Sequence, residues 1–392
     1  MKILHLTYSD NFGGANLAAS RLNDLLNKYK IKSNLLVIDK KTNSKNVNQY
    51  HYFFNFLTKR LRPYLEKILL LAIGLKKHKA SLNIIPSNLS EKINKSDYDI
   101  VHLHWVNNEM ISLTDIANIK KPIFWTLHDL WPASSILHYP EKLNTNHLVK
   151  FILNKYKIRK KRLLKKFLFY IICPSNWIKE KIIKSSFINH KKIFVIPNPI
   201  KINFWKFNRE IINKSNKIQI LIGAVDIIND NRKGFKNFIK ILSRINHDIP
   251  PEIEFIVFGS NNYKMTDNNF NFKIKFVNYL NKNKLRNLYC KANAFIICSE
   301  QDNLPNTAIE SMLCGTPVIY SGNNGLRDII IHKKNGYFIR DFNKNFDLIK
   351  AFKWSLKSKR VTVRAITKNN FGEKFLIQKF FKAYNLAKNN EV

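Results

Sequence analysis

Short apolar runs alternate with longer stretches of helical character from one end of the chain to the other. This alternation constrains the fold more than any single motif does. Neighbouring parallel strands need a long crossover between them, usually a helix, so the pattern predicts parallel sheets with helices on their faces. We expect strands at residues 3–7, 35–38, 99–103, 123–127, 169–173 and 193–196 in the first half, and at 218–223, 254–258, 273–276, 294–298 and 318–320 in the second.

Pro197 and Pro199 interrupt this alternation near the middle of the chain. Proline removes a backbone donor and fixes its φ angle, so two prolines this close together are typical of a connection between domains. The chain has 392 residues, which is more than one hydrophobic core usually serves. We therefore predict two α/β domains, residues 1–198 and 199–370, and a final helix within 371–392, where apolar side chains recur at helical spacing.

The chain is strongly basic, with 67 Lys and Arg residues, 27 Asp and Glu residues and a formal net charge of +40. Lysine is abundant everywhere, which indicates that most of this charge coats a solvated surface. No recognised nucleic-acid-binding module accompanies the charge, so nucleic acid is not an expected partner. The four cysteines lack the paired spacing of a metal or redox motif, and we expect reduced thiols in a cytoplasmic protein.

Basic residues concentrate in two segments, 59–79 and 155–166. The first contains the apolar run 68–75, which is too short to span a bilayer. One interpretation of both segments is a basic amphipathic face that lies on an anionic membrane surface. The other interpretation is an ordinary exposed helix. Under either one, Lys160 and its basic neighbours are expected on the surface.

Two carboxylates, Asp302 and Glu310, flank a loop that leads into a predicted helix. Pro305 lies between them, where proline is tolerated, in the first helical turn. A helix N-terminus presents unpaired N–H groups and the positive end of the helix dipole, which suits a phosphate group. The carboxylates could then bind hydroxyl groups on either side of a bound diphosphate. A pair of hydrolytic carboxylates, as in a glycosidase, is the competing interpretation.

Two further features follow predicted strands of the first half. Gly13 and Gly14 come after strand 3–7 and allow a ligand to approach the backbone closely. The three spaced glycines of a dinucleotide-binding fingerprint are missing, which argues against NAD. His128 follows strand 123–127, at the end of a strand where open parallel sheets bind ligands.

A metal site is the other chemistry that these histidines suggest. His102 and His104 alternate along one predicted strand and could join His128 as metal ligands. No further ligand at a fixed spacing supports such a site. We therefore expect no metal.

Six short motifs together indicate more than any one of them does. In chain order they are Phe12-Gly13-Gly14-Ala15-Asn16, Trp125-Thr126-Leu127-His128-Asp129-Leu130-Trp131, Pro174-Ser175-Asn176-Trp177, Ile196-Pro197-Asn198-Pro199, Arg232-Lys233-Gly234 and the block from Cys298 to Ile319. Their order and spacing resemble the retaining glycosyltransferases of family 4, or group 1 glycosyltransferases, which have the GT-B fold. The acidic pair has seven residues between its members, as in that family, although Asp302 stands where the family usually has glutamate.

This resemblance implies an α/β architecture of two Rossmann-like domains facing a cleft, with a C-terminal helix that crosses back to the N-terminal domain. It implies an enzyme that moves a hexose, with retention, from a UDP- or GDP-sugar to a glycan or lipid-linked acceptor, and the basic segments, which suggest a membrane surface, favour a glycan on a lipid carrier. The implied pathway is the biosynthesis of a bacterial cell-surface polysaccharide, such as capsule, O-antigen or exopolysaccharide. No metal or other cofactor is expected. The expected location is the cytoplasm or the inner face of the plasma membrane.

The resemblance also implies roles for individual residues. His128 would touch the transferred sugar near the reacting carbon, Asp302 would bind a hydroxyl of that sugar, and Glu310 would accept hydrogen bonds from both ribose hydroxyls. Arg232 and Lys233 would neutralise the charge that builds on the leaving diphosphate. The other expected donor-binding residues are Gly13, Gly14, Asn16, Val277, Tyr279, Asn303, Leu304, Asn306 and Thr307.

Two positions depart from the family pattern. Ala224 stands where an arginine often follows the glycine that ends a strand, and Arg232 is the candidate to supply that charge. Asn278 stands where a glycine is common. Two other functions stay open at this point. One is a sugar-nucleotide epimerase, or a glycogen-type phosphorylase or synthase, of the same fold. The other is a non-catalytic basic protein that binds membrane or nucleic acid.

Overall fold

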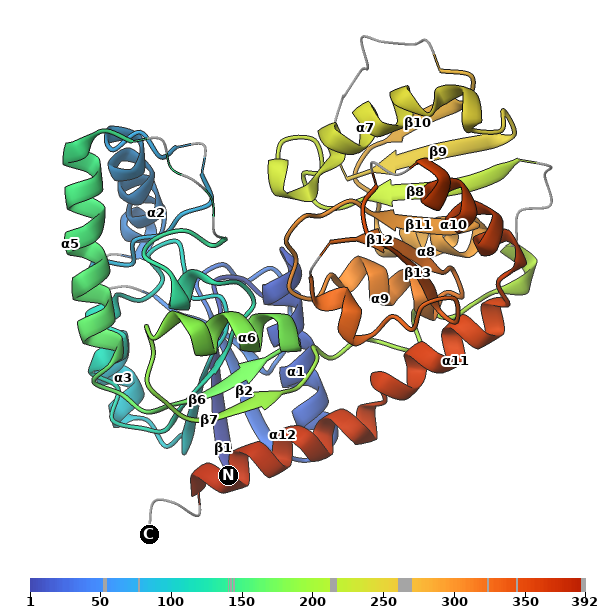
Figure 1. The fold of residues 1–392 in the computed structure, drawn as a ribbon. Coiled ribbons are helices and arrows are strands. Elements are labelled where there is room, and N and C mark those ends of the chain that lie inside the picture. The colour runs from blue at the N-terminus through green and yellow to red at the C-terminus, as the bar shows by residue number, and fades with distance from the viewer. Residues whose placement is uncertain are drawn as a thin grey trace. The chain divides into compact units, whose positions relative to one another are not determined.

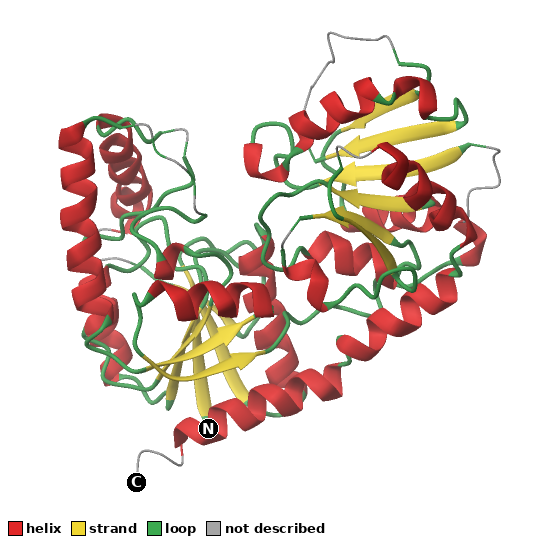
Figure 2. Cartoon of the chain, in the orientation of Figure 1, coloured by secondary structure: helices red, strands yellow, loops and turns green. Residues whose placement is uncertain are grey.

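The computed structural model describes residues 1–51, 55–76, 78–139, 141, 143, 145–211, 217–259, 270–322, 324–342 and 345–388. The chain divides into two compact units. The first contains Met1–Pro199 and the residues from Glu373 onward, and the second contains Ile200–Gly372. Each unit is built around a parallel sheet with helices packed against it (Figures 1 and 2).

The first unit contains, in the described part of the chain, a seven-stranded sheet in the order β3-β2-β1-β4-β5-β6-β7. Its strands are β1 Lys2–Leu6, β2 Lys32–Val37, β3 Val47–Gln49, β4 Ile100–Leu103, β5 Ile123–Thr126, β6 Phe169–Cys173 and β7 His190–Val195. Its helices are α1 Gly14–Lys28, α2 Asn55–Ala72, α3 Leu89–Lys95, α4 Leu113–Ala117, α5 His147–Leu164, α6 Asn176–Ser185 and α12 Glu373–Lys388. Strands β4, β5 and β6 are buried along their whole length, as expected for parallel strands covered on both faces.

The second unit contains, again among the described residues, a six-stranded sheet in the order β10-β9-β8-β11-β12-β13. Its strands are β8 Ile218–Gly223, β9 Ile253–Phe258, β10 Lys273–Val277, β11 Ala294–Ile297, β12 Val318–Ser321 and β13 Gly336–Ile339. Its helices are α7 Phe235–Arg244, α8 Lys282–Lys291, α9 Asn306–Leu313, α10 Asn345–Lys357 and α11 Arg360–Asn370, and a short 3-10 helix, η3, covers Asn231–Lys233.

In both units the strand order reverses at one point. The chain builds outward from β1 to β2 and β3, and then continues with β4 on the other side of β1. In the second unit it builds outward from β8 to β9 and β10, and then continues with β11 on the other side of β8. The loops that follow the central strands therefore diverge at the carboxyl edge of each sheet. Open α/β sheets bind their ligands at such switch points.

The last helix, α12, packs into the core of the first unit. Leu376, Phe380 and Tyr384 are buried in one cluster with Ile3 of β1, and Figure 1 shows α12 lying along this unit. The hydroxyl of Tyr384 lies 2.7 Å from Nδ1 of His102. The helix thus completes the first unit although the whole second unit precedes it in the chain.

Candidate active site

The predicted carboxylates of the second unit lie before and within α9. Asp302 lies in the loop after β11, and Glu310 lies in the middle of α9. Pro305 is the N-cap residue and has an extended backbone (φ −67°, ψ 118°), so the helix begins one residue later than its sequence suggests. Asn306 and Thr307 begin the first turn, and a first helical turn presents N–H groups that the helix itself does not use.

Asp302 is bound by two cations from the loop after β8. Nζ of Lys233 lies 2.6 Å from Oδ2 of Asp302, and a guanidinium nitrogen of Arg232 lies 3.7 Å from the same oxygen. Arg232 also pairs with Asp230 at 2.9 Å and donates to the carbonyl of Gln301 at 2.8 Å. The structure therefore brings three predicted site residues, Arg232, Lys233 and Asp302, into one ion-pair cluster.

Burial and charge act in opposite directions on this ion-pair cluster. Burial alone would raise the pKa of Asp302, but Lys233 and Arg232 outweigh it and hold that pKa below its ordinary value. Burial lowers the pKa of Lys233, and the neighbouring Asp302 offsets only part of this effect. Asp302 is therefore ionised at neutral pH and balances positive charge that is largely shielded from water.

Gly234 holds the cationic loop close to β11. Its φ of +69° lies in the left-handed region, and a Cβ at this position would meet the carbonyl oxygen of Cys298 at 2.2 Å. Only glycine fits so close an approach. The amide of Glu300 also donates to the carbonyl of Arg232 at 3.1 Å. These contacts fix the cations against the loop that leads into α9.

A small pocket at the carboxyl edge of the sheet connects the cationic loop to the start of α9. Its lining includes Ala224, Lys233, Asp302 and Thr307. The predicted site residues of both loops thus share one cavity. The arrangement offers two cations and a helix N-terminus side by side, which is what an anionic ligand such as a phosphate requires.

The other predicted residues of the second unit lie along the same sheet edge. Asn303, Leu304 and Glu310 are buried next to the start of α9 or within it. Val277 ends the edge strand β10 and is partly buried, whereas Tyr279 in the following loop is 51% exposed. Because β9 lies between β10 and β8, Val277 and Tyr279 stand apart from the ion-pair cluster.

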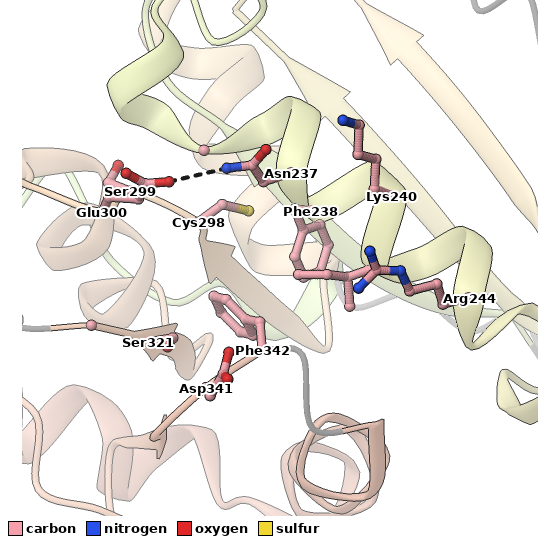
Figure 3. Close-up of a pocket in the computed structure, with 13 residues that line it drawn as sticks. Asn237, Phe238, Lys240, Arg244, Cys298, Ser299, Glu300, Ser321, Asp341 and Phe342 are labelled. Atoms are coloured by element: carbon pink, nitrogen blue, oxygen red, sulfur yellow. Dashed lines mark hydrogen bonds between the residues drawn. The ribbon is translucent and has the colours of Figure 1, made fainter.

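A larger cavity of about 300 Å³ lies between α7 and the loops after β11, β12 and β13. Figure 3 shows its lining, in which Asn237, Lys240 and Arg244 come from α7 and Glu300 is held by Asn237 at 3.1 Å. Among the described residues that line it, none is a predicted donor-binding residue. Its charged groups on α7 are exposed surface side chains. We therefore place the candidate active site at the ion-pair cluster and not in this cavity.

The glycine loop of the first unit leads into α1. Gly13 is the N-cap residue with a φ of +84°, which favours glycine, and the helix begins at Gly14. The amide of Asn16 donates to the carbonyl of Phe12 at 2.6 Å, and its oxygen accepts a hydrogen bond from the hydroxyl of Thr7. Asn16 is therefore buried and ties the glycine loop to the end of β1. Its contact with a ligand remains a prediction.

His128 lies just after β5 and belongs to a row of histidines. Its Nε2 lies 3.2 Å from Nδ1 of His104, and Nε2 of His104 lies 3.0 Å from Nδ1 of His5 on β1. His102 pairs with His5 in the strand register, but its two nitrogens lie 2.7 Å from the hydroxyls of a threonine and a tyrosine. The sequence pattern does not point to His5, because only the pairing of β1 with β4 brings it here.

Burial keeps these histidines neutral. It lowers the pKa of His5 to about 3 and that of His128 to about 4, and it lowers the pKa values of His102 and His104 well below the ordinary value. Ring nitrogens of His5, His102 and His104 lie within 4.8 Å of one another, which admits a metal ion. The facing nitrogens of His5 and His104 are at hydrogen-bond distance, however, and both nitrogens of His102 meet hydroxyls. The arrangement suits hydrogen bonds better than a metal.

Asp129, next to His128, anchors the loop after β5. Its carboxylate accepts hydrogen bonds from Nδ1 of His138 at 2.6 Å, from the indole of Trp105 at 3.2 Å and from a main-chain amide at 3.0 Å. Burial would raise the pKa of Asp129, but His138 and the amide hold it below its ordinary value. Nε2 of His138 lies 3.0 Å from the hydroxyl of Ser81. Ser81 is buried, so this Ser–His–Asp chain braces the loop and is not a hydrolytic triad.

The expectation that Lys160 lies on the surface is wrong. Its side chain is fully buried. The ammonium lies 3.6 Å from the centre of the Trp131 ring and donates to the carbonyls of Trp131 at 2.6 Å and Ser135 at 2.9 Å. The physical reason is the helical period of α5, which turns position 160 inward with Tyr156 and Leu164. Burial lowers the pKa of Lys160 well below its ordinary value.

Helices α2 and α5 lie side by side at one edge of the first unit (Figure 1) and share a core cluster that includes Leu70, Leu153 and Tyr156. Their outer surfaces carry large exposed apolar side chains. These are Leu61, Tyr64, Leu65, Ile68, Leu69 and Leu71 on α2 and Leu148, Phe151, Ile152 and Ile158 on α5. No helix in the described ranges is long and apolar enough to cross a membrane.

The sequence matches two protein-family models. One, described as Glycosyltransferase Family 4, matches residues 45–204, and the other, described as Glycosyl transferases group 1, matches residues 207–373. An uncharacterised glycosyltransferase of Methanocaldococcus jannaschii is 36% identical over 77 residues, which are 20% of this chain and 19% of that protein. The match to this relative thus covers about a fifth of its length.

Several solved structures have the same fold. Anabaena HepE with UDP and glucose is 17% identical, with a TM-score of 0.63 over 98% of this chain and 99% of that one. Sucrose-phosphate synthase of Thermosynechococcus elongatus is 15% identical, with a TM-score of 0.71 over 98% of both chains. A mutant of S. aureus TarM solved with UDP and α-GlcNAc-glycerol is 10% identical, with a TM-score of 0.61 over 98% of this chain and 100% of that one. These likenesses confirm the predicted GT-B fold class.

Proposed function

Because the chain belongs to the group 1 and family 4 glycosyltransferases, we propose that it moves a hexose from a nucleotide-sugar donor to a glycan or lipid-linked acceptor, with retention and without a metal ion. The observation that supports this proposal best is the ion-pair cluster of Arg232, Lys233 and Asp302, which lies before α9 at the switch point of the second sheet. Two cations and a helix N-terminus supply the positive charge that a diphosphate needs.

In this proposal the donor diphosphate binds to Lys233 and the start of α9. The ammonium of Lys233 has three donor hydrogens, and the bond to Asp302 needs one of them. Arg232, held by Asp230, supplies the charge that Ala224 lacks. Negative charge builds on the leaving diphosphate in the transition state, so cations fixed at this place lower the barrier.

The carboxylates are proposed to bind hydroxyl groups of the donor. Glu310 is buried on α9, and one carboxylate can accept hydrogen bonds from both ribose hydroxyls. Asp302, kept ionised by Lys233 and Arg232, would accept a hydrogen bond from a hydroxyl of the sugar. Main-chain groups of Val277 and Tyr279 are proposed to contact the nucleobase. Main-chain groups from Asn303 to Thr307 are proposed to contact the sugar and the phosphates.

His128 and the glycine loop of the first unit are proposed to contact the transferred sugar and the acceptor. Retention can proceed on one face of the sugar: the bond to the leaving phosphate breaks, the acceptor oxygen bonds to the same carbon, and the leaving phosphate takes the acceptor's proton. Such a path needs no protein base. A neutral, hydrogen-bonded His128 agrees with this path.

UDP-sugars are the first donors to test, because HepE was solved with UDP-glucose and TarM with UDP. GDP-sugars come second. The proposed acceptor is a glycan on a lipid carrier, and the proposed pathway is the biosynthesis of a bacterial capsule, O-antigen or exopolysaccharide. Such an acceptor would be met at the inner face of the plasma membrane.

The proposed membrane contact is the outer face of α2 and α5. On α5, Lys155, Lys157 and Arg162 are exposed near Phe151 and Ile158. Exposed apolar and basic side chains on one helix suit the boundary between the headgroups and acyl chains of an anionic leaflet.

The test is release of nucleoside diphosphate. The purified chain is incubated with a panel of UDP- and GDP-sugars and extracted cell-envelope lipids, with and without EDTA. We expect release from at least one donor that persists in EDTA, because cations and a helix N-terminus take the place of a metal. Release restored only by added magnesium or manganese would contradict the metal-independent mechanism. Conversion of the donor to another nucleotide sugar would indicate an epimerase, and binding without turnover a non-catalytic protein.

A further inference from the structure

Lys160 links α5 to the loop that follows β5. The helix is largely exposed, and its buried residues are Val149, Lys160 and Leu164. The side-chain nitrogen of Lys160 donates to the carbonyl of Trp131 at 2.6 Å and to that of Ser135 at 2.9 Å. It also lies 3.6 Å from the centre of the Trp131 ring. The polar residue among the buried three thus holds the loop.

A lysine is costly to bury at this position. Burial lowers its pKa, and a methionine would fill a similar volume without a charge to desolvate. A lysine offers N–H donors for the two carbonyls and a cation for the face of the aromatic ring, which a methionine lacks. Main-chain carbonyls turned away from water need a donor. These contacts indicate that the side chain of Lys160 fixes the course of the loop.

Two hydrogen bonds connect Lys160 to the residue next to His128. The loop starts with His128, directly after β5, and contains the short 3-10 helix η1, Trp131–Ala133. The carbonyl of Trp131 accepts from Lys160, and the amide of Trp131 donates to the carboxylate of Asp129 at 3.0 Å. Asp129 adjoins His128 in the chain, and its charge also raises the pKa of Lys160, although by less than burial lowers it. A displacement of Trp131 would therefore reach His128 through Asp129.

We propose that Lys160 is a positioning residue for sugar transfer: it holds the loop after β5 and, through Trp131 and Asp129, sets the place of His128. Lys160 is fully buried, so it acts through the loop and not on the substrate. For the chemistry at His128, where the transferred sugar is proposed to bind, the inference rests on the proposed function. The proposed nucleotide site belongs to the second unit, so Lys160 should affect turnover and leave UDP binding unchanged.

Two other residues of the first unit provide matched controls. Tyr156 lies one turn before Lys160 on α5, and its hydroxyl donates to the carbonyl of Leu82, which belongs to a different segment. Tyr156→Phe therefore removes a hydrogen bond from α5 but not one to the loop. Leu376 of α12 is buried in a core cluster that contains no residue of the loop. Leu376→Ala should lower stability without loosening the loop.

Hydrogen–deuterium exchange of the whole chain tests the link without any substrate. Amides of the loop are hydrogen-bonded at Leu130, Trp131, Ala133, Ser134 and His138. We expect slow exchange of segment 129–138 in the unmodified chain and about 10-fold faster exchange in Lys160→Met, as the loss of two ordinary hydrogen bonds allows. Tyr156→Phe and Leu376→Ala should leave this segment as it is. Fast exchange of the segment in the unmodified chain would overturn the proposal, whatever the variants do.

The same variants test the consequence for turnover. We expect Lys160→Met to lower kcat for transfer to extracted cell-envelope lipids about 10-fold, since a misplacement of about 1 Å that starts far from the chemistry can cost about 100-fold. The Kd of UDP, measured by calorimetry, should stay at the wild-type value. Folded Tyr156→Phe and Leu376→Ala should keep kcat within about 2-fold of wild type, because a loss of global stability alone does not slow a folded enzyme.

Wild-type exchange of segment 129–138 or wild-type kcat in folded Lys160→Met would overturn the positioning role. If Lys160→Met does not fold, Lys160→Gln takes its place, because its amide keeps an N–H donor but ends one bond short of Nζ. We expect intermediate losses of protection and of kcat in Lys160→Gln, and wild-type values would overturn the proposal. If the unmodified chain turns over no donor while Lys160→Met loosens the loop, the proposed function fails and the link stands. If wild type and folded Lys160→Met turn over donor equally, the reverse holds.

Discussion

Nζ of Lys233 lies 2.6 Å from Oδ2 of Asp302, although 69 positions separate the two residues in the sequence. They follow β8 and β11, which are neighbours in the second sheet. The pair therefore ties the cationic loop to the loop that starts α9. Both side chains are largely buried. Removing Asp302 would leave the buried charge of Lys233 without this counter-ion, and removing Lys233 would leave Asp302 only the more distant Arg232.

Lys233→Met should lower the free energy of unfolding by about 3–5 kcal/mol, the usual cost of breaking a buried ion pair. It should also weaken UDP binding, because a cation at the diphosphate is lost. The double variant Lys233→Met with Asp302→Asn should recover much of the stability but not the affinity, since no unpaired charge remains. Urea unfolding and calorimetry measure the two quantities. Additive losses of stability in the double variant would contradict the pairing.

The same pair predicts how stability depends on pH. Burial would raise the pKa of Asp302, but Lys233 and Arg232 lower it further than burial raises it. The stability that the carboxylate contributes is therefore fully present above about pH 3.9, its unfolded value, and is lost as the pH falls through the lower folded value. The unfolding free-energy difference between wild type and Asp302→Asn should shrink below about pH 4. A difference that stays constant with pH would count against this assignment.

Lys160 predicts a pH dependence at the alkaline end. Burial lowers its pKa, so the unfolded chain binds more protons than the folded one at pH values between the folded pKa and about 10.4. Wild-type stability should therefore rise with pH in this window relative to Lys160→Met. Denaturant unfolding at about pH 7 and about pH 9 measures the change. Lys157→Met, at an exposed position of the same helix, is the control and should show no such trend. A flat difference for Lys160→Met would count against the lowered pKa of Lys160.

Replacing Lys155, Lys157, Arg159 and Arg162 by glutamine should weaken binding to anionic vesicles while leaving UDP binding intact. Each of these charges near such a surface contributes about 1 kcal/mol, and the attraction should fade with salt because the Debye length is about 10 Å at 0.1 M. Lys160 is left unchanged because it is buried. Co-sedimentation at low and high salt measures the binding. Equal binding to neutral and anionic vesicles, or none to either, would rule out an electrostatic membrane contact.

The strands were predictable because buried parallel strands are continuous apolar runs. The predicted residues 169–173 and 218–223 coincide with β6 and β8. Two short strands at sheet edges, β3 and β13, leave little local signal. In β3 only Val47 is buried. In β13, the first residue is Gly336, and a Cβ at this position would meet the carbonyl oxygen of Val318 at 2.5 Å.

The candidate site was predictable where chemistry follows local order, as it does for Asp302 and the start of α9. The contact of His5 with His104 was not, because it depends on the pairing of strands that are far apart in the sequence. Lys160 is a different case, since composition alone places a lysine on the surface. Lys160 lies four residues from both Tyr156 and Leu164, on the inward face of α5. This helical spacing is the sequence signal that could have identified Lys160 as buried.

Calorimetric titration of UDP and GDP into wild type and Glu310→Ala tests the central claim most directly. Glu310 is proposed to accept hydrogen bonds from both ribose hydroxyls, and losing this charged acceptor should cost about 2–4 kcal/mol of binding free energy, or roughly 30- to 1000-fold in Kd. Glu252→Ala, at an exposed position of the same unit, should bind as wild type does, and circular dichroism confirms the fold of each variant. Equal affinity in wild type and Glu310→Ala would contradict the account, as would the absence of binding of either nucleotide to wild type.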